Sequence, residues 1–256
     1  MSLYTQTAGE GGPICFLHGW ALNGSVWDPV VQQLKQHNRI TTVDLPGHGK
    51  SPPPSSGEYT VDSLSESVHK HLTTDTILVG WSLGGLIAIN IAARYPELVR
   101  KLILIASSPQ FANTDSWEHG VKKSIIDGFA SDLIQNYRET IHRFLAIQTF
   151  GSEQAKPVIR ELKAKVFAHG EPHLDSLSKG LKILKNSNLS DVARLIQCPT
   201  LIVLGEKDTL IPKSSGNETR NIIANSQLEI IKGAGHAPFI SHPDEFLKTI
   251  TAFISA

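Results

Sequence analysis

The sequence is poor in cysteine: Cys15 and Cys198 are its only two in 256 residues. Each lies beside a predicted core strand, so we expect two buried, reduced thiols. The first ten residues, MSLYTQTAGE, have neither the basic start nor the apolar segment of a signal peptide. From these absences we expect a protein of the cytoplasm.

Net charge is absent as well. The 24 Lys and Arg residues balance 24 Asp and Glu residues, so overall electrostatics exclude a nucleic-acid binder. No apolar run reaches the roughly 18 residues of a membrane span. The eleven histidines are scattered, and no cysteine–histidine cluster has the spacing of metal ligands. We therefore expect no nucleic-acid or membrane partner, no metal and no cofactor.

Short apolar and β-branched runs alternate with helical patterns along most of the chain. The runs predict strands at 14–17, 40–44, 76–80, 101–106, 200–205 and 228–232. The helical patterns predict helices near 25–36, 61–72, 83–95, 214–224 and 244–255. Most of the strand segments are apolar almost without alternation, which is typical of strands covered on both faces. This order predicts the α/β class, with a mostly parallel central sheet flanked by helices.

The alternation is interrupted once, from Pro109 to about Asn188, where amphipathic helical segments replace strands. We interpret residues 109–188 as a helical cap, inserted into a core formed by residues 1–108 and 189–256. An insertion between two parallel strands suits a cover over the carboxyl edge of the sheet, where open α/β sheets bind their ligands.

The segment GWSLGG, residues 80–85, places a serine between glycines where a predicted strand is followed by a predicted helix. It matches G-x-S-x-G, the pattern of a sharp turn that holds a serine above the sheet. The glycines relieve the crowding that such a turn creates. A structural turn does not need the hydroxyl, so we predict that Ser82 is a nucleophile.

A serine hydroxyl is a poor nucleophile unless a base removes its proton, and an acid should orient that base. In this kind of fold the order along the chain is serine, acid, histidine. Asp208 follows one predicted strand and His236 follows the next, so both project from the same edge as Ser82. We predict these three residues as a catalytic triad. Glu206 is the rival acid, and His242 is interpreted as a helix-entry residue.

The negative charge that develops on the attacked carbonyl needs two backbone N–H donors. We predict Leu83, directly after the serine, as one donor. The other is Trp20, in the loop that begins with His18 and Gly19 after the first predicted parallel strand. His18 is in the wrong place for the base, and we interpret it as a residue that orients this loop. The segment DLPGHGKS, residues 44–51, lacks the spacing of a phosphate-binding loop and is interpreted as a brace for it.

These segments together resemble the α/β-hydrolase superfamily. The patterns H-G-W, D-x-P-G-H-G-x-S, G-W-S-L-G-G, G-x-x-D-x-x-I-P and G-x-G-H-x-P-F occur in that family's order and spacing, over nearly the whole chain. The resemblance implies the α/β-hydrolase fold, with an all-helical cap inserted after the sixth strand.

A narrower resemblance is carried by GWSLGG, RFLAIQ and HAPFISHP. It is to the esterases of biotin synthesis that remove the methyl group from pimeloyl-acyl-carrier-protein methyl ester. The resemblance implies the same triad and an acyl-carrier protein as partner. It also implies substrate contacts at Trp20, Ser82, Leu83, Phe144, Leu145, Ala146, Ile147, Gln148 and His236. We expect the protein to act as a monomer.

Cationic residues gather in the predicted helices that flank RFLAIQ. Those predicted to dock the acidic carrier protein are Arg138, Arg143, Lys156 and Arg160. The alternative is a solvated helix face with i,i+4 pairs such as Glu161–Lys165.

Aromatic side chains in the loops and the cap are predicted either to line an apolar acyl channel or to pack in the core. They are Trp20, Trp81, Phe111, Phe129, Phe144 and Phe150. Two other functions stay open for the same triad, a general short-chain carboxylesterase and a carbon–carbon bond hydrolase. A more distant alternative is a hydrolase-like ligand receptor.

Overall fold

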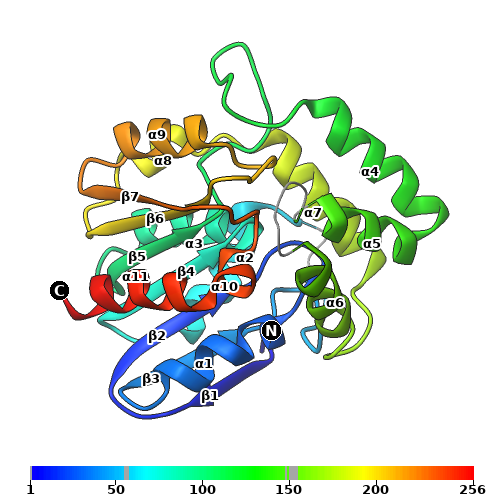
Figure 1. Ribbon diagram of the computed structural model, residues 1–256. Helices are drawn as coiled ribbons and strands as arrows, with labels where there is room; N and C mark the ends of the chain where they lie inside the picture. Colours follow the sequence, from blue (N-terminus) through cyan, green and yellow to red (C-terminus); the bar gives the residue numbers. More distant parts are fainter. Residues whose placement is uncertain (1, 55–57, 148, 150–154) are drawn as a thin grey trace.

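The structure, a computed structural model, describes residues 2–54, 58–147, 149 and 155–256 (Figure 1). In this part of the chain the strands form one seven-stranded sheet, in the order β1-β3-β2-β4-β5-β6-β7. β1 pairs antiparallel with β3, and the other neighbouring pairs are parallel. The predicted α/β class is confirmed. The strands are β1 (Thr5–Ala8), β2 (Gly12–Leu17), β3 (Asn38–Val43), β4 (Thr76–Trp81), β5 (Val99–Ile105), β6 (Thr200–Gly205) and β7 (Ser226–Ile231).

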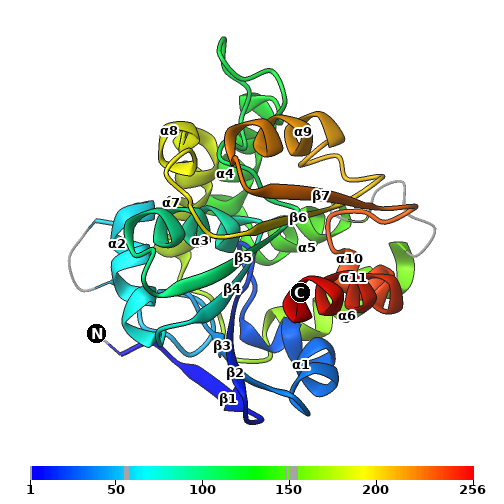
Figure 2. The ribbon, with the colours of Figure 1, turned by 90° about the vertical axis from the view of Figure 1, so that its left-hand side faces the viewer.

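Helices cover both faces of this sheet (Figure 2). On one face lie α1 and α11, and on the other lie α2, α3 and α8, while α9 packs against β6 and β7. Short helical turns complete the core at Gly24–Trp27, His69–His71, α8 (Ser190–Ala193) and α10 (Pro238–Ser241). The longer core helices are α1 (Asp28–Leu34), α2 (Val61–Val68), α3 (Leu83–Arg94), α9 (Lys213–Ile222) and α11 (Pro243–Ser255).

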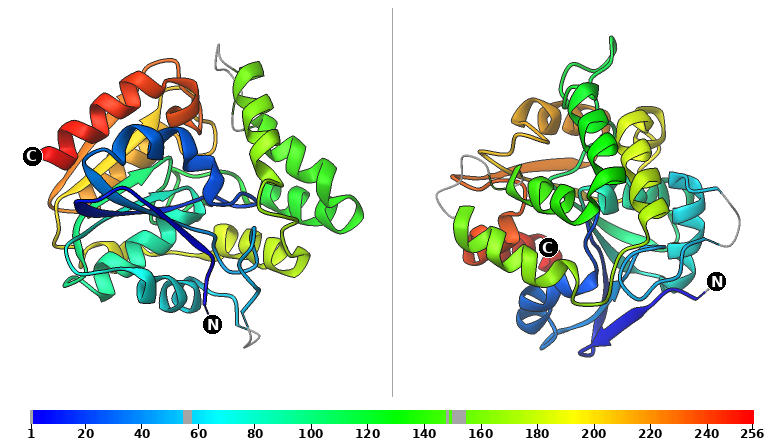
Figure 3. Two further views of the ribbon diagram at one scale, coloured as in Figure 1. Left: turned by 90° about the horizontal axis from the view of Figure 1, so that it is seen from below. Right: turned by 90° about the vertical axis from the view of Figure 1, so that its right-hand side faces the viewer.

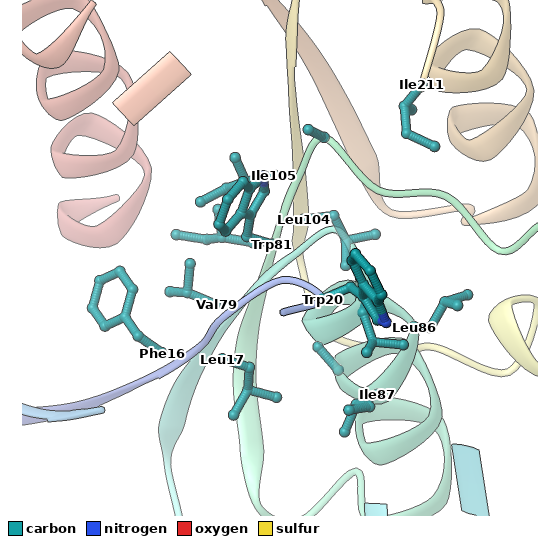
Figure 4. Packing of buried hydrophobic residues seen from close by; sticks show 14 of the residues in the cluster. Phe16, Leu17, Trp20, Val79, Trp81, Leu86, Ile87, Leu104, Ile105 and Ile211 are labelled. Atoms are coloured by element: carbon teal, nitrogen blue, oxygen red, sulfur yellow. The ribbon is translucent and has the colours of Figure 1, made fainter. Parts of the chain in front are cut away.

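The central strands are apolar because both of their faces are covered. Every residue of β4 and of β6 is buried. α3 packs on β4 and β5, and it is buried from Leu83 to Ala92. Figure 4 shows Trp81 of β4 near Leu104 and Ile105 of β5, and Trp20 beside α3 close to Leu86. The edge formed by the carboxyl ends of the strands is therefore a rigid base for the loops above it.

β1 is a strand that the sequence pattern does not predict. Its four residues, TQTA, are partly or fully exposed. They have no apolar run to indicate a strand, and the segment is held by its ladder with β3 at the edge of the sheet. Tertiary pairing therefore decides this element.

The cap helices gather at one end of the molecule, beside the core (Figures 1 and 3). They are α4 (Lys123–Gln135), α5 (Tyr137–Ile147), α6 (Ala155–Val166) and α7 (Leu174–Asn186). The chain enters this region after β5 and returns to the sheet at β6. Five strands, β1 to β5, precede the cap in the described residues. The predicted insertion after the sixth strand is therefore wrong for this chain. The boundaries of the cap at 109 and 188 stay a prediction.

The first part of the cap is not helical, contrary to the all-helical expectation. Isolated bridges pair Ala112 with Val121 and Thr114 with Trp117. Gln110 Nε2 donates to the Ala112 carbonyl (3.0 Å), and Asn113 Oδ1 accepts from the Gly120 N–H (2.6 Å). These side chains satisfy backbone groups that a helix would need for its own ladder, which favours a closed loop.

Both cysteines are free thiols; Cys15 is buried, and Cys198 is only partly buried. Burial raises the pKa of Cys15 to about 12 and that of Cys198 to about 11, so both stay protonated near neutral pH. None of the helices that the structure describes is long and apolar enough to cross a membrane.

Candidate active site

Ser82 lies at the turn between β4 and α3, with φ 55° and ψ −119°. A non-glycine residue with positive φ carries strain of about 1–3 kcal/mol, which the surrounding packing must hold. The turn is tight on both sides of the serine. A Cβ on Gly80 would lie 2.5 Å from the Gly84 carbonyl oxygen, and one on Gly84 would lie 2.6 Å from that of Leu17. The glycines of the motif are therefore required by close backbone approach.

Asp208 and His236 are brought into direct contact by the loops after β6 and β7. His236 Nδ1 donates to Asp208 Oδ2 at 2.8 Å, and both side chains are fully buried. The other carboxylate oxygen, Oδ1, accepts the backbone N–H groups of Leu210 (2.8 Å) and Ile211 (3.0 Å). Because a carboxylate only accepts, the proton of the neutral imidazole lies on Nδ1, and Nε2 is left as an acceptor.

His236 Nε2 is buried and makes no hydrogen bond to any residue that the structure describes. The loop of His236 is tied to the residue before the serine, since Trp81 Nε1 donates to the His236 carbonyl at 2.8 Å and the two rings lie 5.9 Å apart. The structure gives no hydrogen bond from the Ser82 hydroxyl to Nε2. Such contacts are often long without substrate and tighten when the complex forms.

The two predicted oxyanion donors belong to segments that meet at this turn, since a Cβ on Gly19 would lie 3.3 Å from Ser82 Cβ. Leu83 is the first residue of α3, and the first N–H groups of a helix have no partner within it. Trp20 follows β2 in a tight loop, in which the Leu22 N–H donates to the Gly19 carbonyl at 3.3 Å. Neither the Leu83 nor the Trp20 N–H donates to another described residue, so both are available to an oxygen above Ser82.

His18 orients the Trp20 loop, as the sequence predicts. Its Nε2 accepts from the Leu45 N–H (2.9 Å), so its proton is on Nδ1, which donates to the Gly19 carbonyl (2.7 Å). Burial lowers the pKa of His18 to about 4, although the Asp44 charge opposes the shift. A neutral imidazole with both nitrogens engaged cannot serve as the base.

The rival candidates lie elsewhere. Glu206 Oε2 accepts from the Gly233 N–H at 3.0 Å, which together with Lys213 keeps its pKa below the usual range. His242 Nδ1 contacts the Ser241 hydroxyl at 2.8 Å, at the start of α11. Neither side chain forms a hydrogen bond or ion pair with His236 or Asp208.

A small apolar cavity lies directly above Ser82, between the sheet edge and the cap. Its lining is Ser82, Phe111, Val121, Ile125, Ile126, Phe129, Phe144, Leu181, Leu184 and Leu210. Of the predicted cap contacts, only Phe144 faces this cavity. Leu145 is buried elsewhere, Ala146 is exposed and Ile147 is partly buried. Gln148 and Phe150 lie outside the described residues.

The aromatic predictions divide in the same way. Phe111, Phe129 and Phe144 line the cavity. Trp81 does not line it: its ring packs on Phe239 (5.0 Å between centroids) and supports His236 instead. Trp20 packs edge-on against Phe144, at 4.8 Å between ring centroids, and so forms a second layer behind the cavity wall.

The four predicted docking cations are exposed on the cap, but only two of them are unpaired. Arg138 pairs with Glu171, and Arg143 pairs with Asp132. Lys156 and Arg160 on α6 have no ion-pair partner in the described part of the chain. In that same part Lys165 forms its ion pair with Asp28 (2.5 Å), rather than with Glu161.

Asp44 is a buried carboxylate that the sequence interpretation does not single out. Its oxygens accept the N–H groups of Gly24 (2.7 Å) and Lys50 (2.9 Å), and His169 from the cap contacts it at 2.9 Å. Asp44 thus stabilises the end of the loop that contains Trp20, through its hydrogen bond with Gly24. The D-x-P-G-H-G pattern is a signal for this residue, but the pattern does not reveal its cap partner.

A wider groove at the opposite ends of the strands is remote from these residues. Lys101 lies in its wall and donates to the carbonyls of Phe253 (2.8 Å) and Ile254 (3.2 Å), at the end of α11. This lysine therefore caps a helix terminus. Among the residues that the structure describes, no group of three or more His, Cys, Asp or Glu side chains is placed to hold a metal ion.

The buried histidines beneath the site predict how stability depends on pH. Burial lowers the pKa of His18 to about 4 and that of His48 to about 3. Between about pH 6.5 and pH 4 the unfolded chain therefore binds protons that the folded chain excludes, so stability falls as the pH falls. We expect the free energy of unfolding to decrease by up to about 1.4 kcal/mol per pH unit for each histidine.

Urea unfolding across this pH range measures the effect. His48→Asn is the matched variant, because an amide N–H can still donate to the Pro46 carbonyl, which His48 Nδ1 contacts at 3.2 Å. The variant should lose one histidine's share of the slope. A slope equal to that of the wild type would show that His48 does not exclude a proton on folding.

Comparison with known proteins gives the following matches. A family model described as the alpha/beta hydrolase fold matches residues 12–243. The chain is 40% identical over 247 residues to a pimeloyl-[acyl-carrier protein] methyl ester esterase of Pseudoalteromonas atlantica, covering 96% of this chain and 95% of the relative. It is 39% identical over 254 residues to the protein of the same name in Aeromonas salmonicida, covering 99% and 100%.

Solved structures agree with this fold. An esterase from Exiguobacterium antarcticum superposes with a TM-score of 0.91 at 26% identity, covering 99% of this chain and 96% of that one. A bromoperoxidase from Bacillus anthracis superposes with a TM-score of 0.90 at 23% identity, covering 99% and 95%, and shows the fold alone. Both resemblances drawn from the sequence are confirmed by these matches.

Proposed function

The chain belongs to the α/β-hydrolase family, and from this premise we propose that it is a serine carboxylesterase that hydrolyses the methyl ester of pimeloyl-acyl-carrier protein. The products are pimeloyl-acyl-carrier protein and methanol, and the reaction serves biotin synthesis. One observation carries the chemistry. His236 is held by Asp208 through Nδ1, while its Nε2 stays buried and unpartnered among the described residues. The loop of His236 is bonded to Trp81, the residue before Ser82.

In the first half of the reaction, His236 Nε2 takes the proton of the Ser82 hydroxyl as the oxygen attacks the ester carbonyl. The charge that develops on the carbonyl oxygen is stabilised by the backbone N–H groups of Leu83 and Trp20. The tetrahedral intermediate then collapses, and the bond to the methoxy group breaks. His236 returns the proton to the leaving oxygen, so methanol departs and an acyl-enzyme remains.

In the second half, His236 takes a proton from water, and the hydroxide oxygen attacks the acyl carbon. The bond to Ser82 Oγ breaks, and the serine recovers its proton from the imidazolium. Asp208 stays ionised throughout and stabilises the cationic ring. The free carboxylic acid leaves, and the enzyme returns to its starting state.

The cavity above Ser82 supports a substrate whose reacting end is neutral and apolar. No charged side chain is among its described lining residues. A methyl ester fits such a lining. The carboxylate product is destabilised there, because an apolar cavity cannot replace the water that hydrates its charge. The site therefore favours binding of the ester and release of the acid.

We propose the acyl-carrier protein as the macromolecular partner, docked on α6. Lys156 and Arg160 are exposed there without ion-pair partners among the described residues. Arg138 and Arg143 have acidic neighbours and contribute less free charge to this surface.

Two free thiols with raised pKa suit the reducing cytoplasm, which we propose as the location. We also propose that the protein acts as a monomer.

Reversal of charge on α6 tests the docking proposal. For Lys156→Glu combined with Arg160→Glu, we expect KM for the carrier-bound methyl ester to rise by about tenfold, a loss of about 1.4 kcal/mol. We expect kcat and the KM of a free pimelate methyl ester to stay unchanged. Added salt should raise KM of the wild type for the carrier-bound ester only.

The matched control reverses two exposed cations away from the cap, Arg220→Glu with Lys232→Glu. It should leave both KM values near those of the wild type. If the control and the α6 variant behave alike, α6 is not the docking surface. If free short-chain esters turn over as fast as the carrier-bound ester, the protein is a general carboxylesterase on the same triad.

A further inference from the structure

The side chain of Trp20 connects the cap to the loop above Ser82. Trp20 is fully buried, and its Nε1 donates to the Leu177 carbonyl of α7 at 2.8 Å. Its ring packs edge-on against Phe144 of α5 at 4.8 Å between centroids. Figure 4 shows the other side of the ring, where it lies beside α3 close to Leu86. Two cap helices and one core helix therefore enclose a single indole.

Gly180 lies one helical turn after Leu177 on the same helix, and it is buried. A Cβ at this position would lie 2.8 Å from Trp20 Cδ1 and 3.1 Å from Trp20 Nε1. It would also lie 3.7 Å from Leu83 Cδ2. The absence of a side chain at 180 thus lets α7 rest directly on Trp20 and beside Leu83, the two residues to which we assign the oxyanion donors.

A glycine inside a helix is unfavourable by about 1 kcal/mol relative to alanine, so its presence here needs a packing reason. The enclosed ring supplies one, because Trp20 has Phe144 on one side and α3 on another. A ring pushed by a new methyl group has little space to move within its plane. The displacement is passed to the backbone of a short loop in which the next residue, Ala21, already has a φ of 64°.

We propose that Gly180 is a positioning residue for the esterase reaction: by admitting α7 onto the Trp20 indole, it sets the place of the Trp20 backbone N–H above Ser82. The inference rests on the proposed function, in which that N–H stabilises the oxyanion. It also couples the packing of the cap to the oxyanion hole, since the side chain of Trp20 contacts α7 and the backbone of the same residue carries the donor.

Gly180→Ala tests this inference. Because a misplaced donor is felt mainly in the transition state, kcat for a free pimelate methyl ester should fall by between about tenfold and 10²-fold. KM should change by less than about threefold, since no residue of the cavity lining is substituted. Circular dichroism and the melting temperature report whether the variant is folded.

The chain offers a matched control in Gly128, a glycine inside the cap helix α4. A Cβ at Gly128 would meet nothing within 4 Å. Gly128→Ala should therefore keep the kcat of the wild type and gain a few tenths of a kcal/mol in stability from helix propensity. A merely structural role for Gly180 would lower the melting temperature without lowering kcat of the folded enzyme.

Relief of the clash gives a second readout. In the Gly180→Ala background, Trp20→Phe replaces the indole by a smaller ring, and kcat should recover part of its loss. Trp20→Phe alone removes the bond to the Leu177 carbonyl and should lower kcat by a few-fold. If Gly180→Ala does not fold, this single variant decides: turnover at the wild-type kcat would show that the link between indole and cap does not position the donor.

The two levels of the hypothesis fail differently. If the wild type does not cleave the methyl ester, or if Ser82→Ala cleaves it equally well, the proposed function is wrong. If those two proteins behave as proposed and folded Gly180→Ala has the kcat of the wild type, only the role of Gly180 is overturned. A loss confined to KM would likewise overturn it.

Discussion

Ser82→Ala should lower kcat for the pimeloyl methyl ester by about 10⁴- to 10⁶-fold. The oxygen of Ser82 is the atom that forms the acyl-enzyme, and the methyl group of alanine offers no oxygen to take its place. The N–H groups of Leu83 and Trp20 and the apolar cavity remain, so a small residual rate and a nearly normal KM are expected. Single-turnover assays with the carrier-bound ester measure both quantities.

The fold should survive this change, which makes the loss of rate interpretable. Alanine keeps the Cβ that is strained at a φ of 55°, so neither strain nor packing changes much. The free energy of unfolding should stay within about 1 kcal/mol of the wild type. Retention of wild-type turnover in a purified, folded Ser82→Ala protein would remove the serine mechanism altogether.

Asp208→Asn should reduce kcat by about 10⁴-fold although it changes the shape of the side chain hardly at all. The backbone N–H groups of Leu210 and Ile211 both donate to Oδ1, so the amide oxygen of the asparagine must occupy that position. Its NH₂ group then replaces Oδ2 and points at His236 Nδ1. A donor there forces Nδ1 to accept, which moves the ring proton to Nε2 and leaves no base for Ser82.

Glu206→Gln is the matched control, because Glu206 lies two residues earlier on the same loop and contacts neither Asp208 nor His236. Its kcat should stay within about twofold of the wild type. Measurements of kcat against pH for both variants separate the roles. Equal losses in the two variants would mean that the loop matters as a whole and that the hydrogen bond to His236 is not special.

Much of the site could be predicted from the sequence because its determinants are local. The turn at Ser82 depends on glycines that stand within two residues of it and that close backbone approach requires. The contact between Asp208 and His236 follows from topology, since parallel strands bring the loops after their carboxyl ends to one edge. Strands buried on both faces are likewise visible as continuous apolar runs.

Other features could not be predicted, because they depend on which distant side chains meet. Trp20 and Trp81 look alike in the sequence, yet one supports the loop above the site and the other supports His236. The four cap cations also look alike, yet Arg138 and Arg143 are neutralised by acidic partners from other parts of the cap. The strand β1 exists only through its pairing at the sheet edge.

The amino-acid sequence by itself therefore determined the fold class, the family and the three residues of the expected triad, because short-range sterics and strand order suffice for these. Only the tertiary structure decided where the cap enters, which aromatic rings face the cavity, and why α7 carries Gly180. The hydrogen bond from Trp20 to Leu177 joins residues 157 positions apart in the chain, and no local pattern encodes the distance between two such surfaces.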